Sequence, residues 1–360
     1  MKKIALISSN FTYEKPGGVA TLVEGRAEFL RKNNNVRVFA LGKSNDINHS
    51  VGRSKYFKFT FILVWVKLIV ALLKFKPNEI EVHNIPVGLP VFLVFNNTYF
   101  FHGPAKEEAA IEHSSKTRIF LSGLLEKIAI KFSFKIYTAS QAFRDKLHSI
   151  YPKISINKSE ILLPKLVNHQ KSITSDRIHE IEKKILDKYD LNKKDLECSF
   201  VTVRRLVTRT GVPLLLESFI EAKKDKIIPE NSKLFIIGDG PEYDKIKERI
   251  STSSAQKSVY LLGKVSNDER DFFYSSCFYN VVPTLGLEGF GLIVLEAGYL
   301  GCPSIVTNIN ALPEVINALD NKGIVVNPDL MSLKNGLRDS FSKHIDREGL
   351  KKTTIEKFFI

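Results

Sequence analysis

The stretch LEGFGLIVLEAGYLGCPSIV, residues 287–306, decides the fold class of this chain. An apolar, β-branched and aromatic run of strand length, 278–283, precedes it, and residues 304–307 have the same character. The segment between them, 292–300, is too apolar for a loop and is bounded by glycines, which predicts a helix. The stretch therefore predicts a βαβ unit of a parallel sheet.

Two glutamates, Glu288 and Glu296, flank the glycine turn of this unit. The turn lies at the carboxyl end of a strand, where the N–H groups that begin the next helix attract anions. The side chain of Glu296 leans back towards that end of the helix, so the two carboxylates can share one ligand. Two other interpretations stay open at this point: surface acids that complement the helix dipole, and the acid and base of a glycosidase.

Length and composition indicate a folded protein with two domains. A chain of 360 residues is long for one core, and 44% hydrophobic with 26% charged residues is typical of globular proteins. Three scattered cysteines without CxxC spacing argue against a disulfide framework or a zinc site and favour a reducing cytoplasm. The N-terminal apolar run is too short for a signal peptide and predicts a first strand.

Positive charge is concentrated in the first half of the chain. Residues 1–170 hold 25 Lys and Arg against 12 Asp and Glu, a net of 25 − 12 = +13, whereas residues 171–360 hold 28 against 27, a net of +1. This asymmetry indicates an anionic partner such as a membrane leaflet, a lipid phosphate or nucleic acid, with generic solubility as the alternative. The apolar run 59–75 contains lysines, which favours an amphipathic or buried helix, with a surface-bound helix as the minority alternative.

Strand-like and helical patterns alternate along the chain, which predicts α/β architecture with parallel sheets. The predicted strands are 3–8, 36–40, 80–83, 91–95, 135–138, 199–203, 234–237, 259–262, 278–283, 304–307 and 323–326. The predicted helices include 19–32, 118–132, 141–150, 212–223, 243–251 and 292–300. The alternation breaks at 168–197, a highly charged stretch without a strand signal, which we interpret as a linker between two domains.

Glycine-rich turns and a histidine follow three further strands. Gly17 and Gly18 end a loop and open a helix, so their amides can approach a phosphate. Gly238 and Gly240 form a turn against which a base or ribose can lie. His102 follows an apolar run in FFHGPAKEE, at the edge of the sheet where ligands bind.

Three arginines, Arg204, Arg205 and Arg209, lie between a strand and a helix in FVTVRRLVTRTGVPLLLESF. Guanidinium groups stay charged and donate paired hydrogen bonds to anionic oxygens, so this cluster suits a diphosphate.

Several of these motifs together resemble a known family. RRLVTRTGV, IIGDGPE, LLGKVSNDE and PTLGLEGFGLIVLEAGYLGCPSIVTN resemble the C-terminal half of the retaining glycosyltransferases of family 4, also called group 1. PGGVATLVEGRAEFL, FFHGP and ASQAFRDKL resemble the N-terminal half. The resemblance implies the GT-B fold, with two Rossmann-like domains whose parallel sheets face each other across a cleft. Residues 1–167 would then bind the acceptor and 198–345 the nucleotide sugar, with a C-terminal helix in 346–360 returning to the first domain.

The resemblance also implies roles for individual residues. His102 and Glu288 would be catalytic, with His102 beside the sugar and Glu288 on its hydroxyls. The residues implied in binding the nucleotide part of the donor are Gly17, Gly18, Arg205, Arg209, Gly238, Gly240, Gly289, Phe290, Gly291, Leu292 and Glu296. Of these, Glu296 would bind the ribose diol. The chain departs from the family at Thr210, where a lysine is usual, and Arg209 is expected to supply that charge.

The implied activity is transfer of a sugar from a nucleoside diphosphate sugar to an acceptor hydroxyl with retention of configuration. No metal or other cofactor is expected, since no Asp-x-Asp motif is found. A glycan or lipid-linked acceptor in bacterial polysaccharide or lipopolysaccharide synthesis is expected, with the protein cytoplasmic or peripheral on the inner face of the cytoplasmic membrane, and no nucleic acid partner. Two alternatives remain: a nucleotide-sugar epimerase of the same architecture, and a non-enzymatic basic protein that binds membrane or nucleic acid.

Overall fold

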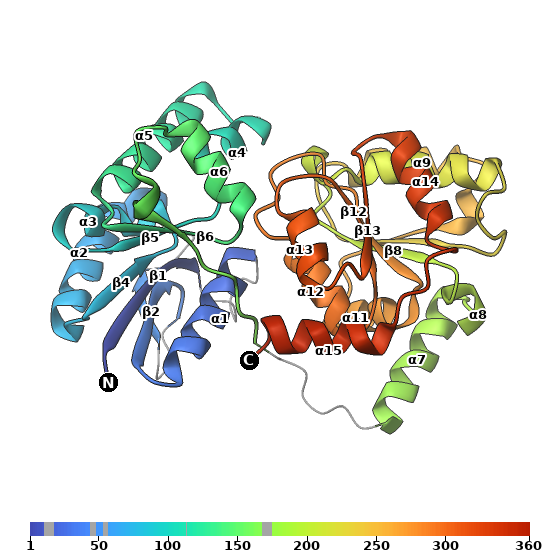
Figure 1. Cartoon of the computed structure of the whole chain (residues 1–360), viewed down its shortest axis with the longest axis horizontal. Coiled ribbons are helices and arrows are strands. Elements are labelled where there is room, and N and C mark those ends of the chain that lie inside the picture. Colours follow the sequence, from blue (N-terminus) through green and yellow to red (C-terminus); the bar gives the residue numbers. More distant parts are fainter. Residues whose placement is uncertain (11–17, 44–47, 53–56, 113, 168–174) are drawn as a thin grey trace. The chain divides into compact units, whose positions relative to one another are not determined.

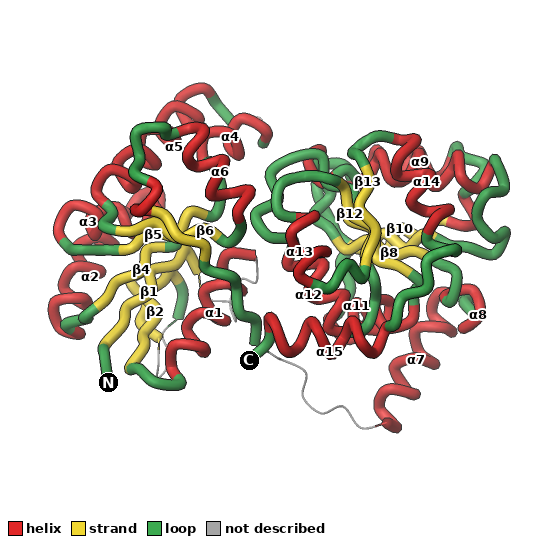
Figure 2. Tube along the Cα trace, viewed as in Figure 1, coloured by secondary structure: helices red, strands yellow, loops and turns green. Residues whose placement is uncertain are grey.

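The computed structural model describes residues 1–10, 18–43, 48–52, 57–112, 114–167 and 175–360 (Figure 1). The chain divides into two compact units: residues 1–168 with 358–360 form unit 1, and residues 169–357 form unit 2. Each unit has its own parallel sheet and its own hydrophobic core, and helices lie on both sides of each sheet (Figure 2). The predicted α/β class with two parallel sheets is confirmed.

Unit 1 contains a sheet of seven described strands in the order β3-β2-β1-β4-β5-β6-β7, with every pair parallel. Its strands are β1 (Lys3–Asn10), β2 (Asn35–Leu41), β3 (Asn48–Gly52), β4 (Glu79–Val82), β5 (Thr98–Phe101), β6 (Lys135–Thr138) and β7 (Ser159–Ile161). Its helices are α1 (Gly18–Arg31), α2 (Phe57–Phe75), α3 (Ile85–Val94), α4 (Ala105–Ile111), α5 (Lys116–Phe132) and α6 (Gln141–Ile150).

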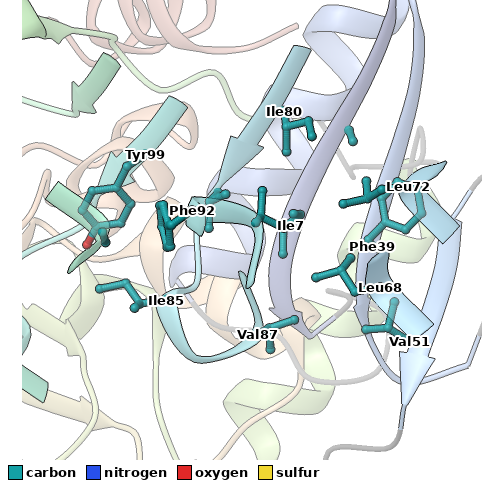
Figure 3. Close-up of a cluster of buried hydrophobic side chains, with 14 of the residues drawn as sticks. Ile7, Phe39, Val51, Leu68, Leu72, Ile80, Ile85, Val87, Phe92 and Tyr99 are labelled. Carbon is teal, nitrogen blue, oxygen red and sulfur yellow. The ribbon is translucent and has the colours of Figure 1, made fainter. Parts of the chain in front are cut away.

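The alternation of side chains along β1 separates the two faces of this sheet. Ile4 and Leu6 pack in one core cluster with α1, whereas Ala5 and Ile7 pack in another with α2, α3 and α5. Figure 3 shows part of the second cluster, in which Leu68 of α2 and several side chains of α3 point towards the strands. The helices α2, α3 and α5 therefore cover one face of the sheet and α1 covers the other.

Unit 2 contains a sheet of six described strands in the order β10-β9-β8-β11-β12-β13, again all parallel. Its strands are β8 (Phe200–Val203), β9 (Leu234–Ile237), β10 (Val259–Gly263), β11 (Tyr279–Val282), β12 (Ser304–Thr307) and β13 (Gly323–Val326). Its helices are α7 (Ser175–Tyr189), α8 (Lys193–Leu196), α9 (Val212–Lys224), α10 (Tyr243–Ser251), α11 (Asn267–Ser276), α12 (Leu292–Tyr299), α13 (Leu312–Ala318), α14 (Leu330–Asp339) and α15 (Arg347–Phe358).

One predicted strand, 91–95, is wrong, because these residues form the end of α3. The segment 85–94 is apolar throughout, so neither the period of a helix nor that of a strand can be seen in its hydrophobicity. Asn84 caps the helix by accepting a hydrogen bond from the Val87 amide at 3.0 Å, and Pro86 lies in its first turn. A capping residue followed by proline was the available sign of a helix start.

The run predicted as a helix over 59–75 is α2, which is kinked at Thr60. Its inner side, including Leu68 and Leu72, is fully buried. Within the described residues, no helix combines the length and the apolar character needed to cross a bilayer.

The region predicted as a linker, 168–197, contains α7 and α8, and its residues from 169 onward belong to unit 2. At the other end of unit 2, the chain leaves α15 and returns to unit 1 with residues 358–360. There Phe359 forms a parallel bridge with Leu166.

Helix α1 and the segment that follows β7 approach each other closely at Gly25. A Cβ atom on Gly25 would lie 1.7 Å from the Lys165 carbonyl oxygen, which is backbone and cannot rotate away. Only glycine fits this crossing.

We expect Gly25→Ala to lower the stability of unit 1 by about 1–3 kcal/mol, since the chain must move apart to admit the methyl group. Gly123→Ala, within α5, is the matched control: its Cβ would meet only the flexible Lys106 side chain, at 3.2 Å. Helix propensity makes this control neutral or stabilising by up to about 1 kcal/mol. Urea denaturation of both variants measures the difference, and equal midpoints would contradict the close approach.

Candidate functional site

The strands β8 and β11 are neighbours at the centre of the sheet of unit 2, and the chain runs from them in opposite directions. From β8 it continues to β9 on one side, and from β11 to β12 on the other side. In parallel α/β sheets ligands bind beyond the carboxyl ends of the strands at such a switch point. The segments that follow β8 and β11 contain the arginines and the Glu288 turn predicted from the sequence.

A buried ion pair joins these two segments. Arg204 Nη2 donates to Glu288 Oε2 at 2.8 Å and to Thr284 Oγ1 at 3.0 Å. The two charged side chains are only 7% and 17% exposed. Charges this deeply buried are stable only when paired, so each holds the other in place.

The glycine turn before α12 holds Glu288 from the other side. Gly291 adopts a left-handed conformation (φ 77°) as the N-cap of α12, and its amide donates to Glu288 Oε1 at 3.2 Å. As a glycine, this N-cap residue has no side chain that could cap the helix. The Glu288 amide donates to Asn310 Oδ1 at 3.2 Å, which ties the turn to the segment after β12. One carboxylate is thus fixed at the positive end of a helix dipole.

The three arginines point in different directions. Arg204 is buried, Arg205 is exposed, and Arg209 is partly buried with Nη1 donating to the Leu287 carbonyl at 3.1 Å. The Nε atom of Arg209 is buried and makes no hydrogen bond within the described part of the chain. The Thr210 hydroxyl donates to the carbonyl oxygens of Arg205 and Val207, so it points into the backbone of this segment.

Glu296 lies in α12 and faces α11. Burial raises the pKa of its carboxyl above the usual value, and the charge of Arg270 opposes this rise. In the described residues it makes no hydrogen bond or ion pair. The Tyr274 hydroxyl nearby is also buried without a partner. Such groups suit a ligand that brings its own hydroxyls.

The turn with Gly238 and Gly240 packs on the segment after β8. A Cβ atom on Gly238 would lie 1.8 Å from the Arg204 carbonyl oxygen, and one on Gly240 would lie 2.3 Å from that of Leu206. These glycines are therefore required by backbone packing beside Arg204, independently of any ligand.

Unit 1 carries the remaining predicted residues. Gly17 lies outside the described residues, and Gly18 is the exposed first residue of α1. His102 follows β5 and is partly buried, with its Nε2 3.1 Å from Nδ1 of His83. Burial and the neighbouring His83 hold the pKa of His102 well below the ordinary histidine value. The ring is neutral at physiological pH.

Among the described residues, no three His, Cys, Asp or Glu side chains are grouped so as to hold a metal ion.

Comparison with known proteins places these features in a family. Residues 183–357, which contain the whole sheet of unit 2, match the family model described as glycosyl transferases group 1. The second half of this chain is therefore a group 1 glycosyltransferase domain. The predicted family is confirmed.

A curated relative is an uncharacterized glycosyltransferase of Methanocaldococcus jannaschii, 27% identical over 266 residues, which are 69% of this chain and 60% of the relative. A second glycosyltransferase of that organism is 27% identical over 57% of this chain and 50% of its own length. The chain therefore spans about half to three fifths of the length of these relatives.

The solved structures show that the fold is GT-B. Anabaena HepE in complex with UDP and glucose matches with a TM-score of 0.74 at 14% identity, covering 100% of this chain and 96% of that one. WaaG, a glycosyltransferase involved in lipopolysaccharide biosynthesis, matches with a TM-score of 0.67 at 16% identity, covering 98% and 93%.

Two contributors to this site, Tyr274 and Asn310, were not predicted. Arg204 was predicted only as part of an arginine cluster for a diphosphate, whereas in the structure it pairs with Glu288. Adjacent residues of an extended segment point to opposite sides, so one of Arg204 and Arg205 had to face inward, but the sequence alone does not say which. Tyr274 lies on another helix, and only the packing of α11 on α12 brings it to Glu296.

We expect Arg204→Ala to destabilise unit 2 by about 2 kcal/mol, below the range for fully buried pairs because Glu288 keeps some exposure. Arg205→Ala is the adjacent control; as an exposed substitution it should change stability by less than about 0.5 kcal/mol. Urea unfolding without ligand measures both. Equal losses would contradict the assignment of the buried pair to Arg204.

Proposed function

We propose that this chain is a retaining hexosyltransferase that uses a nucleoside diphosphate sugar. The observation that carries the proposal is the carboxylate of Glu288, held by Arg204 and the Gly291 amide at the start of α12. Polar groups for a sugar and a positive helix end for a diphosphate thus meet at one sheet edge. The family match, and the UDP and glucose held by HepE in its solved structure, support this ligand class.

The proposed donor lies along the edge of the sheet of unit 2. Arg205, Arg209 and the first amides of α12 hold the diphosphate through charge-assisted hydrogen bonds. Glu296 receives the ribose diol, for which it has no competing partner in the described residues. Glu288 receives hydroxyls of the transferred sugar. Gly238 and Gly240 keep the segment after β8 in place beside the nucleoside.

Catalysis in this proposal rests on charge stabilisation. As the bond from the anomeric carbon to the diphosphate breaks, negative charge grows on the leaving oxygen, and fixed donors stabilise it. The acceptor hydroxyl attacks on the face from which the diphosphate departs, so configuration is retained. Its proton passes to the leaving diphosphate, which balances the exchange of the two C–O bonds.

The proposed acceptor is a glycan or a lipid-linked saccharide of bacterial cell-surface synthesis, bound by unit 1. Its motivation is the exposed side of three neighbouring helices, α2, α3 and α5, which we call the apolar-basic face. The exposed apolar residues of this face are Phe61, Ile62, Leu63, Val66, Val70, Leu73, Leu93, Val94, Phe120, Leu121, Leu124 and Phe132. Contiguous apolar surface of this kind marks an interaction site.

The charge of the apolar-basic face selects its partner. Its exposed ionisable residues are Lys67, Lys74, Lys116, Arg118, Lys127 and Lys131. The described side chains of α2, α3 and α5 include one acid, Glu126, which is fully buried. Apolar and basic groups without acids fit an anionic bilayer, where each cation contributes about 1 kcal/mol and apolar groups enter the interface. We propose peripheral docking on an anionic leaflet.

The donor assignment predicts different losses from two variants, measured by calorimetry with UDP and uridine. Arg205→Ala should weaken the binding of UDP by roughly tenfold or more and leave the binding of uridine unchanged, because in the proposed complex the arginine contacts only phosphates. Glu296→Ala should weaken the binding of UDP and of uridine by similar factors, because both ligands contain the ribose diol. Equal losses of UDP and uridine in Arg205→Ala would reject the diphosphate role.

Transfer itself is tested with a panel of nucleoside diphosphate hexoses, including UDP-glucose and GDP-mannose, and a lipid extract as acceptor. Glu288→Ala should lose transfer, and near-normal turnover would reject its role. A product epimerised without any acceptor would instead identify the alternative epimerase.

Docking predicts co-sedimentation with anionic vesicles at low salt, loss of it at high salt, and none with neutral vesicles, since salt screens exposed charges. The double variant Lys67→Glu/Lys127→Glu should remain in the supernatant. The matched control, Lys245→Glu/Lys247→Glu, makes the same charge change on exposed residues of α10 in unit 2 and should sediment normally. Wild-type protein that stays in the supernatant with anionic vesicles at low salt would overturn docking and leave the transferase proposal intact.

A further inference from the structure

The face of the unit 1 sheet that α1 covers contains a row of buried polar side chains. Glu81 and His83 are two residues apart at the end of β4, and His102 follows the neighbouring strand β5. Glu81 is 4% exposed and His83 is 5% exposed. Polar groups at this depth need partners. Glu81 pairs with Arg26 and His83 Nδ1 meets His102, whereas His83 Nε2 makes no hydrogen bond within the described residues and has Glu81 as its neighbour at 3.5 Å.

The row begins with an ion pair between α1 and β4. Arg26 Nη2 donates to Glu81 Oε1 at 2.6 Å, and Arg26 Nε lies 3.2 and 3.1 Å from the two carboxylate oxygens. Burial alone would raise the pKa of Glu81, but contacts with His83 and Arg26 lower it to about 2. Glu81 is therefore an anion at physiological pH.

The row continues through two imidazole rings. His83 Nε2 lies 3.5 Å from Glu81 Oε2, and His83 Nδ1 lies 3.1 Å from His102 Nε2. The ring of Phe100 stacks on both, with centroids 4.9 Å from His83 and 4.7 Å from His102. This stack limits rotation of the two imidazoles.

The Glu81 anion determines which ring nitrogens of His83 and His102 carry a proton. The contact from Glu81 to His83 is longer than an ordinary hydrogen bond, but a carboxylate oxygen attracts an N–H and repels a lone pair. A neutral His83 therefore keeps its proton on Nε2 and presents a lone pair at Nδ1. His102 must then donate from Nε2, which leaves its own Nδ1 without a proton.

We propose that Arg26, Glu81 and His83 form a positioning chain that holds His102 as the Nε2–H tautomer and makes its Nδ1 a hydrogen-bond acceptor for a substrate hydroxyl. The link to a hydroxyl substrate rests on the transferase function proposed above. His102 Nδ1 has no hydrogen-bond partner among the described residues and, unlike Nε2 of His83, is not fully buried, so it is left for a ligand. Glu81 and His83 act through His102 and touch no substrate.

The tautomer is measured without any substrate. Long-range ¹H–¹⁵N correlation spectra of the ¹⁵N-histidine-labelled protein distinguish protonated from unprotonated ring nitrogens, and His102→Gln identifies the signals of His102. At pH 8, above the ordinary histidine pKa of about 6.5, His102 should carry its proton on Nε2. A proton on Nδ1 in the wild-type protein would overturn the proposal.

Glu81→Gln tests the direction of the chain. Arg26 takes the single amide oxygen, so the amide N–H₂ faces His83 and donates to it. His83 then donates from Nδ1, and the proton of His102 moves to its Nδ1. Glu79→Gln, the same change on the same strand, is the matched control: Glu79 is half exposed and pairs with Lys2 at 2.6 Å. The control should keep the wild-type tautomer, and a Glu81→Gln protein that also keeps it would overturn the proposal.

Turnover separates this inference from the proposed function. With UDP-glucose as donor, Glu81→Gln should lower kcat/KM about tenfold, the scale of one neutral hydrogen bond. The affinity of unit 2 for UDP should be unchanged. A reversed tautomer with unchanged kcat/KM would overturn the acceptor role of Nδ1. Absence of turnover in the wild-type protein would count against the proposed function, while the spectra would still decide the tautomer.

Discussion

The ion pair between Arg204 and Glu288 determines where the other groups of the candidate site lie. It joins the segments that leave β8 and β11 in opposite directions, so it fixes the two sides of the switch point to each other. Arg209 holds the same turn through the Leu287 carbonyl, and Asn310 holds it from the segment after β12. Because a buried charge without a partner is costly, this turn has little freedom to move independently of the sheet.

Unit 1 also contains a buried Arg–Glu pair, but its carboxylate has a different role from that of Glu288. Its buried pair, Arg26 and Glu81, also joins neighbouring parts of a sheet and a helix near strand ends. There the Glu81 carboxylate is buried against Arg26 and His83. It can therefore influence a ligand only through the orientation of His102. In unit 2 the carboxylate of Glu288 is itself part of the candidate binding surface. In the roles proposed above, one kind of interaction supplies a ligand group in unit 2 and orients a ligand group in unit 1.

The sequence predicts those parts of the structure that depend on local patterns. The predicted elements 135–138, 141–150 and 243–251 coincide with β6, α6 and α10, because each has a clear period and clear ends. The strands β3, β5 and β7 were not predicted. β3 and β7 are short edge strands that carry polar residues, whereas β5 directly follows the misread apolar run of α3. The helix α3 was misread because an apolar run without polar positions has no visible period.

The site residues also divide into those that a local sequence pattern identifies and those that depend on the tertiary fold. Glu288, Glu296 and the glycine turn could be identified from spacing within one βαβ unit. The inward turn of Arg204 and the contact of His83 with His102 depend on which strands are neighbours and how far each runs. That information is distributed over β4, β5, β8 and β11 and is absent from any single stretch. Sequence patterns therefore locate ligand groups better than they locate the residues that hold those groups.

The return of residues 358–360 to unit 1 has a consequence for synthesis on the ribosome. The bridge between Leu166 and Phe359 completes unit 1 with residues that are translated after the whole of unit 2. The nascent chain can form both hydrophobic cores before this contact exists, since neither core contains residues 359–360. This contact of unit 1 therefore forms only after the whole of unit 2 has been translated, in contrast to a domain whose segments are contiguous in the chain.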